Sequence, residues 1–297
     1  MNEFLIWFVG IILFIAAIID IKTREVPDFL SYTLIAVALA SNAISSAAQL
    51  SFVPILGSLA GLLFAFCLGW ALFYLGQWGG GDSKLIIGIG AAFGLPIITA
   101  NSLNLDIISY LKSDIVALLS NMILVGALYA MMMAFILAFR NKDAVMKKTS
   151  ELLKESRAWR IPFSAMLIVA SVTIYFLTSG FERNLLIILL LLCAGFSYLW
   201  VFVKAVEETA MKKWVSPQKV TEGDWFAESV IVGKKTIVSN KDPGITKEQI
   251  KELMAAFKKG KIKKVKIKEG IPFVPNFFLS YLVTLFFGSL VFYFVLI

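Results

Sequence analysis

Histidine is absent from the 297 residues of this chain, and cysteine occurs only twice. Without histidine, the chain cannot carry a Ser-His or Cys-His nucleophile pair, a histidine-ligated zinc ion or an HExxH helix. Two cysteines are also too few for a four-cysteine zinc site. Because Cys67 and Cys193 both lie in apolar stretches, we expect them to be small buried hydrophobic residues. The catalytic options that remain are carboxylate, lysine, serine and tyrosine chemistry.

Charged residues are scarce as well, at 16% of the chain, whereas 59% are hydrophobic and the mean hydropathy is +0.83. This composition is typical of a polytopic membrane protein, in which each helical span needs about 20 apolar residues. Eight stretches approach that length: residues 4–21, 29–47, 53–76, 85–100, 115–139, 161–178, 185–203 and 273–297. The fourth is short and glycine-rich. We therefore expect an all-α membrane protein with about eight transmembrane helices.

The distribution of positive charge predicts how these spans are oriented. Eight spans leave seven loops, and the odd-numbered loops carry 26 of the 28 lysines and arginines. Only Lys112 and Arg183 fall in the even-numbered loops. By the positive-inside rule, the odd-numbered loops lie in the cytoplasm and both termini lie outside the cell membrane.

The seventh loop, residues 204–271, is long enough for a small cytoplasmic α+β insertion. It separates a membrane core of residues 1–203 from a last transmembrane helix in residues 272–297. Residues 228–239 alternate as in a hairpin, Thr246 and Gln249 form a capping-box pattern, and Gly260 would end the following helix. Residues 261–268 read KIKKVKIK, an alternation suited to an edge strand protected by lysine. We expect a ββαβ-like appendage.

The fifth loop, residues 140–160, is the other strongly basic segment. It can form an amphipathic helix at the membrane interface, or an ordinary solvated connector. The apolar contacts of such a helix would be Val145, Met146, Leu152 and Trp159. In the insertion, the basic stretch 247–268 contains only Phe257 as an aromatic residue and adjoins a membrane, so we expect anionic lipid rather than nucleic acid as its partner.

Two aspartates stand at span ends, near hydrocarbon, where a carboxylate is expensive and often functional. Asp20 ends the first span and Asp82 begins the fourth, so the two intervening spans return both residues to the same cytoplasmic face. Two neighbouring carboxyl groups can share one proton, so that the ionised one activates water while the protonated one polarises a peptide carbonyl. Considered singly, Asp20 also fits a membrane-boundary residue and Asp82 a helix N-cap in a glycine-rich turn.

The surrounding residues form two motifs. Residues 20–28 read DIKTREVPD, and residues 79–85 read GGGDSKL, followed by further glycines. These motifs resemble those of the archaeal preflagellin and prepilin peptidases, which belong with the bacterial type IV prepilin peptidases among the GxGD aspartyl proteases. The resemblance covers roughly the first 140 residues. The matching residues are Asp20, Lys22, Val26, Pro27, Asp28, Gly79, Gly81, Asp82, Lys84, Leu85, Gly88, Gly90 and Gly94.

The resemblance implies that Asp20 and Asp82 are the catalytic pair of a membrane-embedded aspartyl endopeptidase without metal or cofactor. Its substrates would be archaellin or type IV pilin-like precursors, cut behind a basic leader at the cytoplasmic membrane face. Bacterial members that also methylate their product usually carry an N-terminal domain with four cysteines. This chain begins with its first span and lacks those cysteines, so it resembles the archaeal, cleavage-only type.

The remaining motif residues have supporting roles in this interpretation. Gly79, Gly81, Lys84, Lys22 and Pro27 would shape the site. Two acidic residues near Asp20, at positions 25 and 28, would bind the basic residues at the end of the leader. Alternatively, Glu25 and Asp28 belong to a polar loop with a pre-proline turn.

Two other functions also use intramembrane carboxylates. A presenilin-like protease would cut within a transmembrane helix, but the downstream Pro-Ala-Leu motif of that family is missing here. A transporter or ion pathway would hold its carboxylates near the bilayer midplane, whereas Asp20 and Asp82 stand at span ends. Both functions are kept as alternatives to the leader peptidase.

Overall fold

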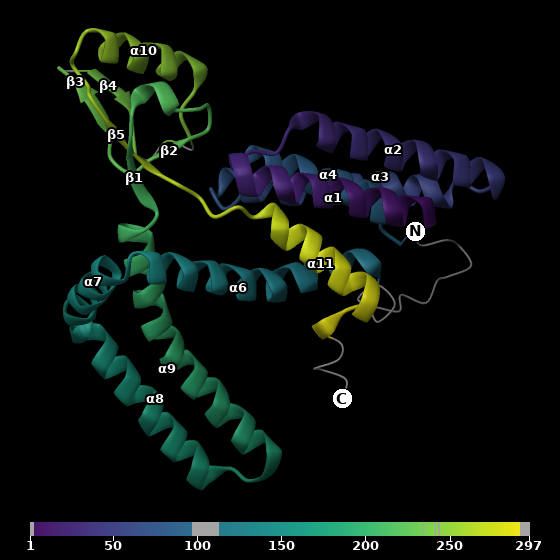
Figure 1. The fold of residues 1–297 in the computed structure, drawn as a ribbon. Helices are drawn as coiled ribbons and strands as arrows, with labels where there is room; N and C mark the ends of the chain where they lie inside the picture. Colours follow the sequence, from purple (N-terminus) through teal and green to yellow (C-terminus); the bar gives the residue numbers. More distant parts are fainter. Residues whose placement is uncertain (1–2, 97–112, 234, 241, 243, 292–297) are drawn as a thin grey trace. The chain divides into compact units, whose positions relative to one another are not determined.

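The structure is a computed structural model that describes residues 3–96, 113–233, 235–240, 242 and 244–291. It is mostly helical (Figure 1). The chain forms two units, Met1–Met131 with Gly270–Ile297 and Met132–Glu269. The end of the expected fourth span, Lys112 and the end of the expected eighth span lie outside the described residues.

The first unit is a bundle of apolar helices. Its elements are α1 (Glu3–Thr23), α2 (Asp28–Ala48), α3 (Val53–Tyr74), α4 (Gly80–Phe93), the first part of α6 (Asp114–Arg140) and α11 (Val274–Phe287). α4 packs against both α2 and α3, and α1 packs against α11. The first and last described helices are therefore neighbours, and Leu5, Leu13 and Phe277 share the buried core.

Small residues allow α4 to approach α2 and α3 closely. A Cβ atom at Gly88 would lie 2.8 Å from the Leu34 side chain, and one at Gly90 would lie 2.5 Å from the carbonyl oxygen of Gly61. Neither distance leaves room for a methyl group. Helices in a membrane depend on such close packing, because lipid tails are as apolar as the helix surfaces.

Buried polar side chains connect α6 to α11. Asn121 donates a hydrogen bond of 3.0 Å to Oγ1 of Thr284, and Asn276 donates one of 3.2 Å to the carbonyl oxygen of Met122. Both asparagines are fully buried. Hydrogen bonds of this kind hold transmembrane helices together. They also fix the register of α11 on α6.

The helical part of the second unit contains α7 (Lys142–Glu155), α8 (Arg157–Leu177) and α9 (Gly180–Thr209). The expected amphipathic helix within residues 140–160 is present as α7. Its Val145 and Leu152 side chains are buried in one cluster with Val201 and Ala205 of α9. The prediction that these two residues contact the membrane was therefore wrong, because α9 covers them.

The rest of the second unit is a small α+β domain. Its elements are β1 (Lys212–Val215), the 3₁₀ helix η1 (Pro217–Lys219), β2 (Trp225–Phe226), β3 (Val230–Val232), β4 (Lys235–Val238), α10 (Lys247–Lys258) and β5 (Val265–Lys268). β3 and β4 form the expected hairpin. Thr246 and Gln249 make the reciprocal capping-box hydrogen bonds, and Gly260 follows α10 with a φ of 68°.

The expectation of an edge strand at 261–268 was wrong. β5 is the central strand of an antiparallel sheet in the order β1-β5-β2. Its lysines do not protect an edge but form ion pairs, Lys266 with Glu228 at 2.8 Å and Lys268 with Glu207 at 2.7 Å. Alternation in the sequence identified the strand, while only the pairing partners decided its place in the sheet.

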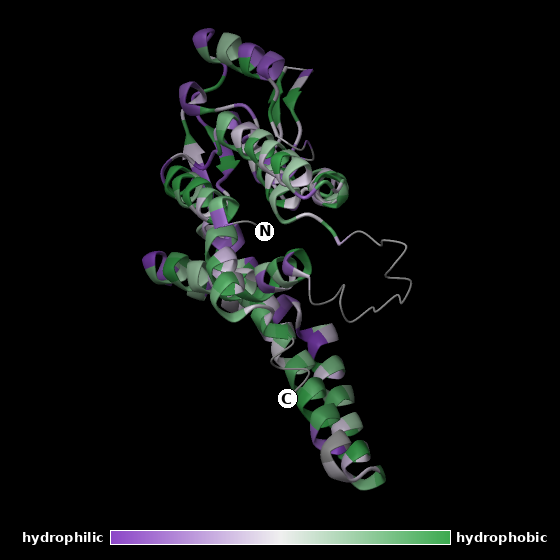
Figure 2. Cartoon of the chain, turned by 90° about the vertical axis from the view of Figure 1, so that its right-hand side faces the viewer, coloured by the Kyte–Doolittle hydropathy of each residue, from purple (hydrophilic) through white to green (hydrophobic). Residues whose placement is uncertain are grey.

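Among the described residues, six helices are long and apolar enough to cross a membrane: α1, α2, α3, α6, α8 and α9. α4 and α11 have 14 residues each, which is shorter than a full span. Figure 2 shows hydrophobic colour along α8 and α9 and hydrophilic colour on α10. Cys67 and Cys193 are exposed rather than buried as expected, because apolar helix surfaces of a membrane protein face lipid as well as protein.

Candidate active site

Asp20 lies near the C-terminal end of α1 and is buried, with 5% of its surface exposed. Its Oδ2 atom accepts a hydrogen bond of 2.9 Å from the backbone N–H of Val274, the first residue of α11. The backbone N–H of Phe273 also interacts with this carboxylate. N–H groups at a helix N-terminus lack partners within the helix and suit a carboxylate. The start of α11 therefore holds the Asp20 side chain in place.

The turn after Asp20 is fixed by Arg24. Arg24 adopts the left-handed conformation with a φ of 62°, and its N–H donates to the carbonyl oxygen of Asp20 at 2.9 Å. Its Nη1 atom donates to the carbonyl oxygen of Gly270 at 3.0 Å. A left-handed residue other than glycine costs roughly 1–2 kcal/mol. This strained turn ties the end of α1 to the segment that enters α11.

Asp82 is the third residue of α4, at the N-terminal end of that helix. Its Oδ2 atom accepts a hydrogen bond of 3.2 Å from the backbone N–H of Gly79. A carboxylate in the first turn satisfies an otherwise unpaired amide and suits the positive end of the helix dipole. Asp82 is partly exposed, so the glycine-rich turn leaves it accessible.

The helices α1 and α4 contact each other, and the charge of Asp20 acts on Asp82. The loop between α1 and α2 also lies directly on the glycine-rich turn. A Cβ atom at Gly81 would be 2.9 Å from Cβ of Val26 and 3.3 Å from its backbone nitrogen. The glycine at position 81 is thus required by the close approach of the α1–α2 loop.

Comparison with known proteins identifies the same region. Residues 7–139 match the type IV leader peptidase family. Over these residues the chain is similar to that family. The match contains both aspartates and both motifs, and it ends within α6, so α11 lies outside it.

Three proteins named preflagellin peptidase are similar to this chain. The Methanococcus maripaludis protein is 30% identical over 144 residues, which are 48% of this chain and 59% of the relative. The Methanocaldococcus jannaschii protein is 34% identical over 102 residues, 33% of this chain and 42% of the relative. The Methanococcus voltae protein is 35% identical over 79 residues, 27% of this chain and 34% of the relative. The chain thus spans less than two thirds of the length of each relative.

The other residues of the leader peptidase motifs lie around the aspartates. Nζ of Lys84 lies 2.7 and 2.8 Å from the two carboxylate oxygens of Asp28, which joins α4 to the first residue of α2. Pro27 is the N-cap residue of α2. The side chains of Lys22 and Glu25 are exposed beside this loop.

The site also contains groups that the sequence analysis missed. The amides of Phe273 and Val274 contact Asp20 from about 250 positions away in the chain. A backbone amide has no side-chain signature, so no sequence pattern identifies this contact. Arg24 stands inside the first motif, but its left-handed conformation and its contact with Gly270 are visible only in the folded chain.

Aromatic rings form one side of the region. Trp78, immediately before the glycine-rich turn, packs on Phe273 and Phe277 with ring centroids 6.2 and 5.4 Å away. Such aromatic pairs add stability beyond the area that they bury. These ring contacts hold the glycine-rich turn of Asp82 against the N-terminal end of α11. The same end of α11 contacts Asp20.

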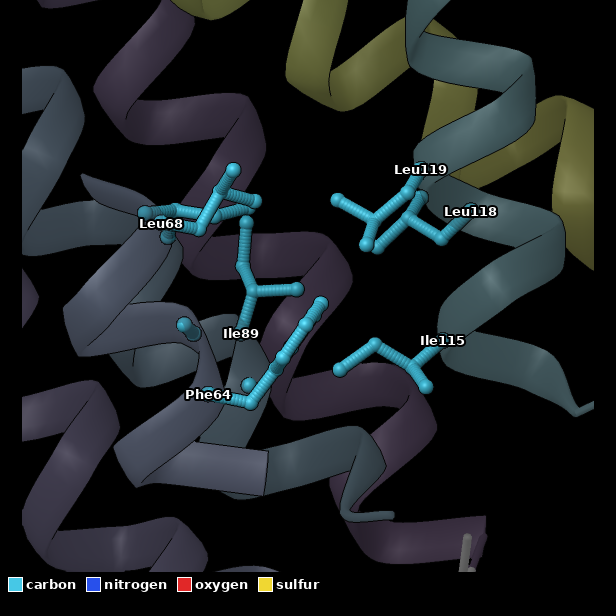
Figure 3. A pocket seen from close by; sticks show the side chains of 9 residues that line it. Phe64, Leu68, Ile89, Ile115, Leu118 and Leu119 are labelled. Atoms are coloured by element: carbon cyan, nitrogen blue, oxygen red, sulfur yellow. The ribbon is translucent and has the colours of Figure 1, made fainter. Parts of the chain in front are cut away.

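A small hollow in the first unit lies apart from this chemistry. It is lined by Phe64, Ala65, Leu68, Ile86, Ile89, Gly90, Ile115, Leu118 and Leu119, from α3, α4 and α6 (Figure 3). All of these residues are apolar or glycine. The hollow offers no acid, base or nucleophile among its lining residues.

Proposed function

We propose that this chain is a membrane-embedded aspartyl endopeptidase in which Asp20 and Asp82 act as one catalytic pair. The observation that supports the proposal is the charge of Asp20, near the end of α1, acting on Asp82 in the first turn of α4, a helix that contacts α1. The match to the type IV leader peptidase family supports the same reaction class. No observation of the described residues favours a transporter or a presenilin-like protease over this reaction.

The proposed reaction uses one proton shared by the two carboxyl groups. The ionised aspartate removes a proton from water, and the water oxygen attacks the scissile carbonyl carbon. The protonated aspartate donates its proton to the carbonyl oxygen. When the tetrahedral intermediate collapses, the C–N bond breaks, the proton on its oxygen returns to a carboxylate, and the leaving amine takes the proton that came from water. One water and one peptide bond are consumed, with no metal or cofactor.

The substrates we propose are archaellin or type IV pilin-like precursors with a basic leader. Support comes from the name of the similar proteins, preflagellin peptidase. Glu25 is exposed next to the turn of Arg24 and is placed to attract a positive leader. The Asp28 carboxylate is already engaged by Lys84, which makes Glu25 the stronger candidate for this contact.

We propose that the site faces the cytoplasm and that both termini lie outside the cell membrane. The argument is the concentration of lysine and arginine in the odd-numbered loops. Asn141→Cys, made in a Cys67→Ser and Cys193→Ser background, tests the orientation. A membrane-impermeant maleimide should label it only after the cells are permeabilised, and labelling in intact cells would reverse the proposed orientation.

We also propose that anionic lipid is a partner of the insertion. Residues 258–264, which begin with the last residue of α10, contain five lysines in seven positions. Clustered lysines near a membrane attract anionic headgroups, and salt screens this attraction. Activity in nanodiscs with anionic lipid should exceed activity in neutral nanodiscs at low salt and converge with it at high salt.

Cleavage of purified substrates tests the proposed function most directly. The purified protein is incubated with an archaellin precursor, a pilin precursor and a secreted binding-protein precursor, and the product N-termini are sequenced. We expect the unaltered protein to cleave once, at the C-terminal end of the basic leader, and Asp20→Asn to give no cleavage. Cleavage of none of the three precursors by the unaltered protein would reject the proposal.

A further inference from the structure

Tyr129 of α6 is a buried phenol whose hydroxyl the fold does not use. The residue is 5% exposed, and its hydroxyl has no hydrogen-bond partner among the described residues. A buried polar atom without a partner costs free energy, and such atoms are rare in folded proteins. A phenylalanine would fill the same space without that cost, so the hydroxyl calls for a partner beyond the described residues.

The packing of α6 against α11 indicates that Tyr129 lies near Asp20. Near one end of the contact, Asn121 of α6 bonds Thr284 of α11. Further along α6, a Cβ atom at Gly126 would come within 2.7 Å of Nδ2 of Asn276. As the α6 positions rise from 121 to 126, their α11 partners fall from 284 to 276, so the two helices run antiparallel.

This register can be continued by one turn. Residues three apart on a helix lie on the same face, so Tyr129 follows Gly126 along the face that contacts α11. Because α11 runs in the opposite direction, the next contact along it lies about one turn before Asn276. Phe273 and Val274 stand there, and their amides contact Asp20. The charges of Asp20 and Arg24 both act on the Tyr129 hydroxyl, which agrees with this position.

We propose that the Tyr129 hydroxyl is a third polar group of the active site and donates a hydrogen bond to a main-chain carbonyl oxygen of the bound precursor beside the scissile bond. This inference rests on the proposed peptidase function. A phenol O–H needs an acceptor, and an extended peptide presents a carbonyl at every residue. The contact would hold the precursor backbone against the aspartate pair and would give the hydroxyl the acceptor that it lacks among the described residues.

Tyr281 of α11 provides a matched control. It is also a buried tyrosine of the first unit, 1% exposed, but its hydroxyl donates to the carbonyl oxygen of Ile6 within the protein. Removing that hydroxyl breaks a hydrogen bond between α11 and α1. Removing the hydroxyl of Tyr129 breaks no hydrogen bond among the described residues.

The experiment compares Tyr129→Phe and Tyr281→Phe with the unaltered full-length protein in detergent. We measure kcat/KM for a leader-bearing precursor and the midpoint of thermal unfolding. Tyr129→Phe should lower kcat/KM about tenfold or more, the typical effect of one lost hydrogen bond, with an unfolding midpoint that is unchanged or higher. Tyr281→Phe should lower the unfolding midpoint and keep kcat/KM within about twofold of the unaltered value.

Two outcomes would overturn the inference. One is an unchanged kcat/KM in Tyr129→Phe, whatever happens to its stability. The other is a fall in kcat/KM of equal size in both variants, which would indicate a general effect of disturbing α11. Failure of the unaltered protein to cut any precursor is a separate result, because it rejects the proposed function itself.

Discussion

The backbone N–H of Val274 donates a hydrogen bond of 2.9 Å to the carboxylate of Asp20, across 254 positions of sequence. Arg24 reinforces this contact through the carbonyl oxygen of Gly270. The match to the type IV leader peptidase family ends at residue 139, well before these partners. The helix at the end of the described chain is therefore part of the site even though the family match does not include it.

Removal of the insertion and removal of α11 should have different effects. Replacing residues 212–269 with a flexible linker keeps the Val274 amide beside Asp20, and neither proposed catalytic residue lies in that segment. Activity on a short leader peptide should then be largely retained, and activity on a full-length precursor should fall further. Ending the chain at residue 269 removes the α11 contacts, so it should abolish both activities. Both are measured by cleavage assays on protein shown to be folded.

Two results would contradict this prediction. Equal and complete loss with both substrates in the folded linker variant would mean that the insertion is not accessory. Full activity of the chain that ends at residue 269 would mean that α11 does not support Asp20.

Asp20→Asn and Asp82→Asn should each abolish turnover. Asparagine is close to aspartate in shape but cannot ionise, so expression and precursor binding should be largely retained. The double variant should be no worse than either single variant, because residues that act as a unit are not additive. Cleavage by the unaltered protein and the three variants, with and without a chelator, tests this. Substantial activity in either single variant, or inhibition by the chelator, would argue against a metal-free aspartate pair.

The pH dependence of cleavage should be bell-shaped. A pair that shares one proton is inactive when both carboxyl groups are protonated at low pH and when both are ionised at high pH. The rate with saturating substrate, measured between the pH limits of folding, should fall on both sides of an optimum. A rate that rises steadily and then levels off would indicate only one essential titrating group.

Gly81→Ala should reduce activity much more than Gly79→Ala. A Cβ atom at Gly81 would lie 2.9 Å from Cβ of Val26, whereas one at Gly79 would lie 3.4 Å from its nearest neighbour, Oδ2 of Asp82. The first substitution must push the α1–α2 loop away from α4, while the second fits within ordinary van der Waals contact. Thermal unfolding and kcat/KM of both variants check this. Equal effects would show that the loop does not depend on Gly81.

Glu25→Lys should raise KM for a basic leader more than it lowers kcat, because contacts away from the scissile bond mainly supply binding. The matched substrate is the same precursor with its leader lysines and arginines changed to neutral residues, for which the variant should differ little from the unaltered protein. An equal effect on both substrates would exclude charge recognition by Glu25.

Asp28→Lys is expected to act differently, because it also breaks the ion pair with Lys84. The exchanged variant, Asp28→Lys with Lys84→Asp, restores a pair of opposite charges between α2 and α4. Such a partly exposed pair is worth only about 0.2–1 kcal/mol. If the exchange recovers the activity lost by Asp28→Lys, the role of Asp28 is to hold α4. If it does not, Asp28 acts on the precursor.

Local patterns were sufficient for much of the fold. The hairpin of β3 and β4, the capping box of Thr246 and the helix end at Gly260 depend on residues within a few positions of each other, and the structure confirms all three. Of the eight apolar runs, six correspond to long apolar helices of the described residues, because the length of such a helix is set by the bilayer rather than by any partner. The other two runs correspond to α4 and α11, which have 14 residues each.

Contacts between distant elements were decided only by the folded chain. The alternation in KIKKVKIK predicts a strand, but the position of β5 between β1 and β2 depends on which strands pair with it. Val145 and Leu152 form an apolar face on α7, but the choice between lipid and α9 as its partner depends on packing. In both cases the sequence defines a surface and does not define what covers it.

The candidate site divides in the same way. The sequence by itself determined that the two aspartates stand at the ends of apolar runs and that two such runs separate them, because hydropathy suffices for that. Only the tertiary structure brought Phe273 and Val274 to Asp20, Val26 to Gly81 and Lys84 to Asp28. The physical reason is that these contacts depend on which distant segments pack together. Every residue has a backbone amide, so no residue type marks the place where two segments meet.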